Sequence, residues 1–131
     1  MIFNIAYFKT KLILILSVLF TFPLNLAKAE EVRLPKSVSP SFYNLDLTPD
    51  LDKATFAGSE KIKLNITKST TDITLNSSEI DIKEANLTND KTKEKFSLTV
   101  SYNPDIETAT LKAKDKLALG DYTLRLSYNG I

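Results

Sequence analysis

The sequence predicts an all-β domain built as an antiparallel β-sandwich. Apolar and polar residues alternate with a period of two along most of the chain after residue 40, as in strands that bury one face. Turn-forming residues separate the alternating stretches at short intervals. No stretch carries the sustained apolar stripe of an amphipathic helix. Seven to eight short strands with frequent turns are typical of a β-sandwich.

Four stretches alternate most clearly and are expected to form strands with one buried face and one solvated face. Their apolar rows are Tyr43, Leu45 and Leu47; Ile62, Leu64 and Ile66; Phe96, Leu98, Val100 and Tyr102; and Tyr122, Leu124, Leu126 and Tyr128.

Shorter strands are predicted at 73–75, 79–82, 84–88 and 107–113, and a short turn fits best at 113–119. The expected turns are Pro49-Asp50, Asn89-Asp90, Asn103-Pro104-Asp105 and Gly120-Asp121. Gly58 interrupts a strand pattern, which predicts a bulge or a close backbone approach. Gly120 can supply the positive φ that a hairpin turn needs.

The first 29 residues have the three-part pattern of a secretory signal peptide. Lys9 and Lys11 precede the apolar run 12–22, and Ala27-Lys28-Ala29 is a small-x-small cleavage signal. Cleavage after Ala29 would leave one β-sandwich domain at 30–131 in an exported protein, periplasmic or extracellular. The alternative is a membrane anchor at 1–29, although a spanning helix needs about 20 apolar residues and Pro23 interrupts this run early.

The charge balance argues against a nucleic-acid partner. The chain has 17 Lys and Arg residues and 16 Asp and Glu residues. Three of the 17 basic residues and none of the acidic ones precede the predicted cut, so the mature chain would carry 14 basic groups, 16 acidic groups and a net charge of −2. A mixed, nearly neutral chain lacks the basic surface of a nucleic-acid or membrane binder.

Candidate catalytic residues are few, because the chain contains no His and no Cys. Asp50 and Asp52 offer two carboxylates to calcium, but a turn is the better interpretation. Lys36-Ser37 and Lys68-Ser69 lack the S-x-x-K context of an activated nucleophile, so exposed polar faces are the better interpretation. No catalytic, cofactor-binding or metal-binding residue is therefore expected.

Three tripeptides, beginning at Asn65, Asn76 and Asn86, match the N-glycosylation sequon. In a eukaryotic secretory chain these sites would be open to modification. The simpler interpretation is that strand residues happen to match this short pattern.

Several ordered motifs resemble the N-terminal domain of the aminopeptidase N-like zinc metallopeptidases. The resemblance extends from Arg33 to Ile131 and depends on the order and spacing of its parts. These parts are Arg33-Leu34-Pro35, the segment 42–47 with Pro49-Asp50-Leu51, Phe56-Ala57-Gly58-Ser59-Glu60, Ile73-Thr74-Leu75-Asn76-Ser77, Gly120-Asp121-Tyr122-Thr123-Leu124 and Tyr128-Asn129-Gly130-Ile131.

The resemblance implies a scaffold role and not chemistry in this chain. In the family a catalytic domain follows the sandwich, with H-E-x-x-H holding zinc and G-A-M-E-N gripping the free N-terminus of a peptide. This chain contains neither motif, so it looks like a fragment that is inactive alone, and zinc is expected only in the missing catalytic domain. That domain is the expected partner, and peptide substrate would be met only through it. The alternative is a stand-alone secreted β-sandwich that binds a protein or a glycan.

Overall fold

A computed structural model describes residues 33–131, which fall within one compact unit. The predicted signal peptide at 1–29 and the alternative anchor lie outside the described residues. Within 33–131, no helix has the length and apolar character needed to cross a membrane.

The described part of the chain is all-β, as predicted. Its elements are β1 (Val38–Asp50), β2 (Thr55–Ile66), β3 (Thr70–Asn76), β4 (Ile80–Asn89), β5 (Lys95–Asn103), the short 3-10 helix η1 (Pro104–Ile106), β6 (Thr108–Leu117) and β7 (Gly120–Gly130).

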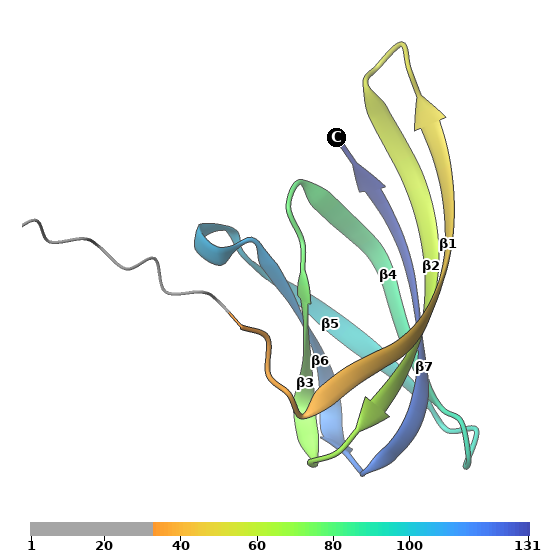
Figure 1. Cartoon of the computed structure of the whole chain (residues 1–131), viewed down its shortest axis with the longest axis vertical. Coiled ribbons are helices and arrows are strands. Elements are labelled where there is room, and N and C mark those ends of the chain that lie inside the picture. Colours follow the sequence, from red (N-terminus) through yellow and green to blue (C-terminus); the bar gives the residue numbers. More distant parts are fainter. Residues whose placement is uncertain (1–32) are drawn as a thin grey trace, which may run out of the picture. The chain divides into compact units, whose positions relative to one another are not determined.

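The seven strands form one curled antiparallel sheet in the order β1-β2-β7-β4-β5-β6-β3. The first four strands make one layer and the last three make the other (Figure 1). Only three residue pairs join β4 to β5, at the hairpin end of both strands. Beyond these pairs the two strands diverge, so the sheet folds over and encloses apolar side chains between its layers.

The core lies between the two layers, and two of the four predicted apolar rows, those on β2 and β7, are buried in it. The predicted row on β5 is only partly buried, and Tyr102 at its end is 47% exposed. Ile62 pairs with Leu124, which pairs with Leu87, and all three are buried. The opposite layer contributes buried residues from β3 and β6, such as Ile73 and Leu111. The largest fully buried side chains are Ile66, Ile73, Leu87, Leu111, Leu117, Tyr122 and Leu124.

The strands predicted at 79–82 and 84–88 are one strand, β4. The register between β4 and β7 shifts between Ile82 and Glu84, so Lys83 is an extra residue. Ile82 and Ala85 both face the core although three positions separate them. The bulge breaks the alternation and makes one strand look like two in the sequence.

The turn predicted at 113–119 is wrong in its extent, because β6 continues to Leu117 and the turn falls at 118–119. Thr70 pairs with Leu117 while Asp72 pairs with Lys112, so on the β3 side residues 113–116 lie opposite Thr71 alone, although Ala113 still pairs with Leu98 of β5. The bulge hides the period of two at this point. Within residues 33–131 the helical turn lies instead at η1, where the Asn103 side chain accepts a hydrogen bond from the backbone N–H of Asp105 at 3.1 Å.

A polar network connects the outer face of the four-stranded layer to the β4–β5 turn. Lys63 Nζ donates to Asp90 Oδ2 at 2.9 Å and to Thr123 Oγ1 at 2.8 Å. Thr123 Oγ1 in turn donates to Asp90 Oδ1 at 2.6 Å. The hydrogen bond from Lys63 is the main reason that the pKa of Asp90 is lowered. The network fixes the turn against β2 and β7.

Candidate functional site

The described residues do not fit a metal site. No group of three or more Asp and Glu residues in 33–131 converges as metal ligands would, and the chain supplies no His or Cys. Asp50, considered for calcium, instead closes the β1–β2 turn. Its carboxylate accepts hydrogen bonds from Lys53 N at 3.2 Å and Lys53 Nζ at 2.7 Å, and the bond from Nζ is the main cause of its lowered pKa.

The two Lys-Ser pairs are also structural. Ser69 Oγ donates a hydrogen bond to the carbonyl of Leu117 at 2.9 Å, which ties the start of β3 to the end of β6. The carbonyl of Ser37 accepts a hydrogen bond from Thr67 N at 2.9 Å. Both serines therefore contribute to strand contacts at the sheet ends.

All three sequon asparagines lie in strands, as interpreted from the sequence. Asn65 Nδ2 donates to Asp121 Oδ1 at 2.7 Å, a contact between β2 and the start of β7. Asn76 and Asn86 are exposed.

Two aromatic residues on β2 and β7 each lie over a glycine of the other strand. The register pairs Gly58 with Tyr128 and Phe56 with Gly130. A Cβ added to Gly58 would lie 2.3 Å from the ring of Tyr128, and one added to Gly130 would lie 2.1 Å from the ring of Phe56. The two rings meet edge to face, with centroids 6.3 Å apart.

We call these four residues the aromatic–glycine interlock. At Gly58 the register with both neighbouring strands is uninterrupted, so the glycine serves a close approach and not a bulge. Each ring covers backbone that a glycine leaves bare. The predicted close approach at Gly58 is therefore confirmed. The predicted positive φ at Gly120 is confirmed too, with a value of 142°.

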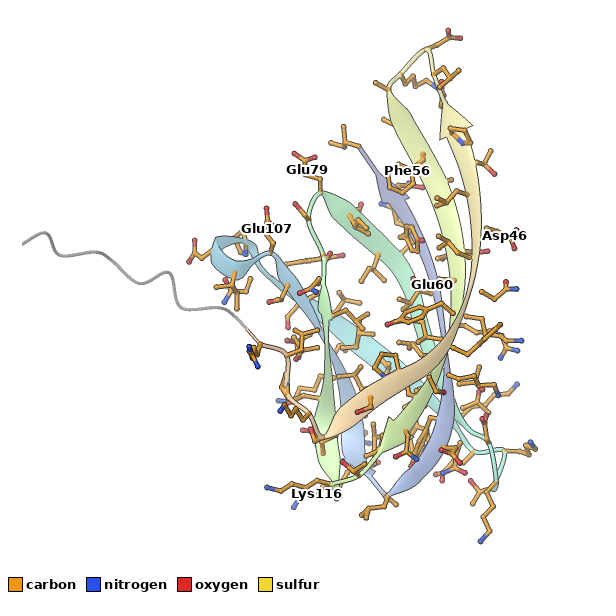
Figure 2. All side chains as sticks on the ribbon, in the orientation of Figure 1. Asp46, Phe56, Glu60, Glu79, Glu107 and Lys116 are labelled. Carbon is orange, nitrogen blue, oxygen red and sulfur yellow. The ribbon has the colours of Figure 1, made fainter. Side chains whose placement is uncertain are left out.

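One end of the interlock opens into a groove of about 1200 Å³. Phe56, Ile80 and Tyr102 contribute apolar surface to it, and Tyr102 is held by a hydrogen bond of 2.7 Å from Ile82 N to its hydroxyl. No Lys or Arg is among its lining residues, whereas five carboxylates line it: Asp50, Asp52, Glu79, Asp81 and Glu107. Figure 2 labels Phe56, Glu79 and Glu107 at this end of the molecule.

The inward row of β1 is only half covered. Tyr43, Leu45 and Leu47 lie on the same face of the sheet as the core, since they pair with Ile62, Glu60 and Gly58 of β2. Their side chains are nevertheless 55%, 53% and 52% exposed. The predicted orientation of this row is correct, but β1 is the edge strand of its layer and solvent reaches it.

Glu60 lies within this apolar face. It pairs with Leu45 on one side and Leu126 on the other, and Ile62 follows it in the same inward row. Burial is the cause that raises the pKa of its carboxyl above the ordinary value of 4.5. Burial, followed by the charge of Glu60, also raises the pKa of Tyr128. Within residues 33–131, no hydrogen bond or ion pair reaches the Glu60 carboxylate.

The sequence interpretation missed Glu60 because the alternation was followed only from Ile62 onward. Counting back by two from Ile62 places Glu60, Gly58 and Phe56 on the same inward face. The signal was therefore present as a charged residue in an apolar row.

Comparison with known proteins identifies the family. A model of the peptidase M1 N-terminal domain matches residues 39–131, which contain the seven strands almost completely. The chain belongs to this family. The match supports the resemblance to an aminopeptidase N-like N-terminal domain that the ordered motifs indicated.

Several aminopeptidases resemble the chain over about three quarters of its length. Aminopeptidase 2 of Candida albicans is 35% identical over 96 residues, which are 73% of this chain and 10% of that protein. Aminopeptidase N of Acetobacter pasteurianus is 32% identical over 98 residues, which are 75% of this chain and 26% of that protein. Aminopeptidase M1 of Arabidopsis thaliana is 32% identical over 105 residues, or 77% and 12%. The chain thus spans about a tenth to a quarter of the length of these relatives.

Proposed function

We propose that this chain is the non-catalytic N-terminal β-sandwich of an exported zinc aminopeptidase. In that role it packs against the catalytic domain and walls one side of the substrate cleft. The observation that carries the proposal is the family match across the whole sandwich, together with relatives that are named as aminopeptidases. The described residues do not fit a zinc site, so the metal and the peptide-cleaving groups would come from the catalytic domain.

The half-exposed row on β1 supports a packing role. Fully burying a large apolar side chain contributes about 1.5–3 kcal/mol, so covering the exposed half of Tyr43, Leu45 and Leu47 would contribute about 1 kcal/mol each. Exposed apolar rows on a sheet face mark interaction surfaces.

The reading frame that encodes the chain provides the test of the peptidase role. We expect it to extend beyond codon 131 to G-A-M-E-N and H-E-x-x-H. We also expect its product to hydrolyse leucine p-nitroanilide with zinc, and to lose that activity with 1,10-phenanthroline. The 131-residue chain should show no hydrolysis with zinc supplied. A longer product that is inactive with zinc, or zinc-dependent hydrolysis by the 131-residue chain, would contradict the proposal.

Export is tested by the N-terminus of the mature protein. Edman sequencing of the exported product should begin at Glu30, the residue after the predicted cut. A protein that keeps Met1 and fractionates with membranes would favour the anchor alternative.

A further inference from the structure

Glu60 is a charged residue on a sheet face whose neighbouring side chains are apolar. Leu45 and Leu126 flank it across the strands, and Ile62 follows it in the same row. The neighbouring residues Tyr43, Leu45 and Leu47 are about half exposed, so this side of the sheet is open to a partner. We call these three residues with Glu60 the β1–β2 patch.

A partner that covered the β1–β2 patch with apolar groups alone would remove Glu60 from water without compensation. An isolated carboxylate costs several kcal/mol when it is buried unpaired. No residue of 33–131 makes a hydrogen bond or an ion pair to its carboxylate. The compensating group must therefore come from the partner.

We propose that the β1–β2 patch docks an apolar protein segment that carries one arginine or lysine, whose cationic head pairs with Glu60. The three apolar side chains supply the area, and the carboxylate selects the partner and fixes its position. Guanidinium is the better match, because it pairs with a carboxylate through two parallel hydrogen bonds and is more weakly hydrated than ammonium.

A second copy of the chain is a poor occupant of the same patch. Two copies packed face to face through the β1–β2 patch would bring two Glu60 carboxylates into one apolar interface with no cation. Like charges in such an interface cost several kcal/mol, which disfavours self-association. Charge complementarity thus points to a different, cationic partner.

On the proposed function, the cationic partner is the catalytic domain of the same protein. The inference rests on the proposed function for that identification alone. The pairing itself is a property of the patch. A longer product without peptidase activity would remove that identification and leave the binding results below unchanged.

The test uses n-hexylguanidinium, which carries the head group of arginine on an aliphatic chain, and n-hexylurea as its uncharged match. Each probe is titrated at millimolar concentrations into the 131-residue chain and followed through the ¹H–¹⁵N resonances of Leu45, Glu60 and Leu126. We expect saturable shifts, with the guanidinium binding about fivefold tighter than the urea. Glu60→Gln should abolish that difference. Glu84→Gln, on the exposed outer face of β4, should preserve it.

Three results would overturn the proposal. The first is equal binding of the two probes to the wild-type chain, or no shift at these three amides. The second is undiminished guanidinium binding by Glu60→Gln. The third is a dimer, seen by analytical ultracentrifugation as a rising sedimentation coefficient, in which Tyr43 and Leu47 become protected from solvent. That dimer would make a second copy the occupant.

Discussion

Replacing Gly58 by alanine tests whether the interlock is as tight as the structure indicates. The new Cβ would lie 2.3 and 2.7 Å from two ring carbons of Tyr128 and 3.0 Å from Cδ2 of Leu47. Carbon atoms in van der Waals contact are about 3.5–4.0 Å apart, so the ring must move by about 1 Å. It has little room, because Tyr128 is 7% exposed and Phe56 meets it edge to face.

The magnitude follows from two opposing effects. Overpacking a tightly filled site costs about 1–3 kcal/mol. Alanine also restricts the unfolded chain more than glycine does, which stabilises the folded protein by about 0.4–1 kcal/mol. The net expectation is a loss of about 1–2 kcal/mol in the free energy of unfolding. For a domain of about 100 residues, this lowers the melting temperature by about 5–10 °C.

The assay is urea unfolding of the 131-residue chain followed by circular dichroism in the β-sheet region, with Ser59→Ala as the control. Ser59 is exposed on the outer face of the same strand, so its substitution should change stability by less than about 0.5 kcal/mol. Truncating the ring removes the clash, so Gly58→Ala in a Tyr128→Ala background should be neutral or stabilising. An unchanged stability of Gly58→Ala, or an equal loss in both backgrounds, would refute the reasoning.

Three further predictions concern the core and two carboxylates, each measured by urea unfolding. Leu124→Ala should cost about 2–5 kcal/mol because Leu124 is fully buried, and a loss under about 1 kcal/mol would contradict its place in the core. Asp90→Asn should cost about 0.5 kcal/mol at pH 7, discounted for the exposure of its partner Lys63. Because the folded pKa of Asp90 is lowered, its contribution to the free energy of unfolding is present above the unfolded value near 3.8 and is lost as the pH falls through the folded pKa. A cost of Asp90→Asn that does not shrink as the pH falls below 3.8 would contradict this. Glu60→Gln should stabilise the chain at pH 7. The raised pKa of Glu60 means that folding disfavours its ionised form. The stability that Glu60→Gln gains over the wild type should therefore vanish below the ordinary pKa of 4.5. A variant less stable than the wild type at pH 7 would contradict this prediction.

The regular part of the fold could be predicted because burial on one face imposes a period of two. The rows that contain Ile62 and Leu124 are buried as expected. The pattern failed where the strands bulge. Lys83 in β4 and residues 113–116 in β6 are extra residues relative to the neighbouring strand, and they shift the alternation. The position of each bulge depends on pairing with a strand that is distant in the sequence.

The exposure of the β1 row could not be predicted from alternation alone. Tyr43, Leu45 and Leu47 have the pattern of core residues, but burial depends on which strand is at the edge and how far the second layer extends. The same limit applies to the groove, whose walls come from turns far apart in the sequence. Glu60, in contrast, could have been found from the sequence, since it is a charged residue at an inward position.

The interlock gives a physical reason for two of the motifs on which the family resemblance depends. Phe56-Ala57-Gly58 on β2 and Tyr128-Asn129-Gly130 on β7 have the same order of aromatic and glycine. Because the two strands are antiparallel, this order places each aromatic opposite a glycine, and the two rings then fill the space that the two missing side chains leave. If only one of the two motifs were present, one aromatic ring would lack the space that a glycine provides, or the space above one glycine would stay unfilled. The pair therefore specifies the register of β2 on β7, and these motif residues act through packing and not through chemistry.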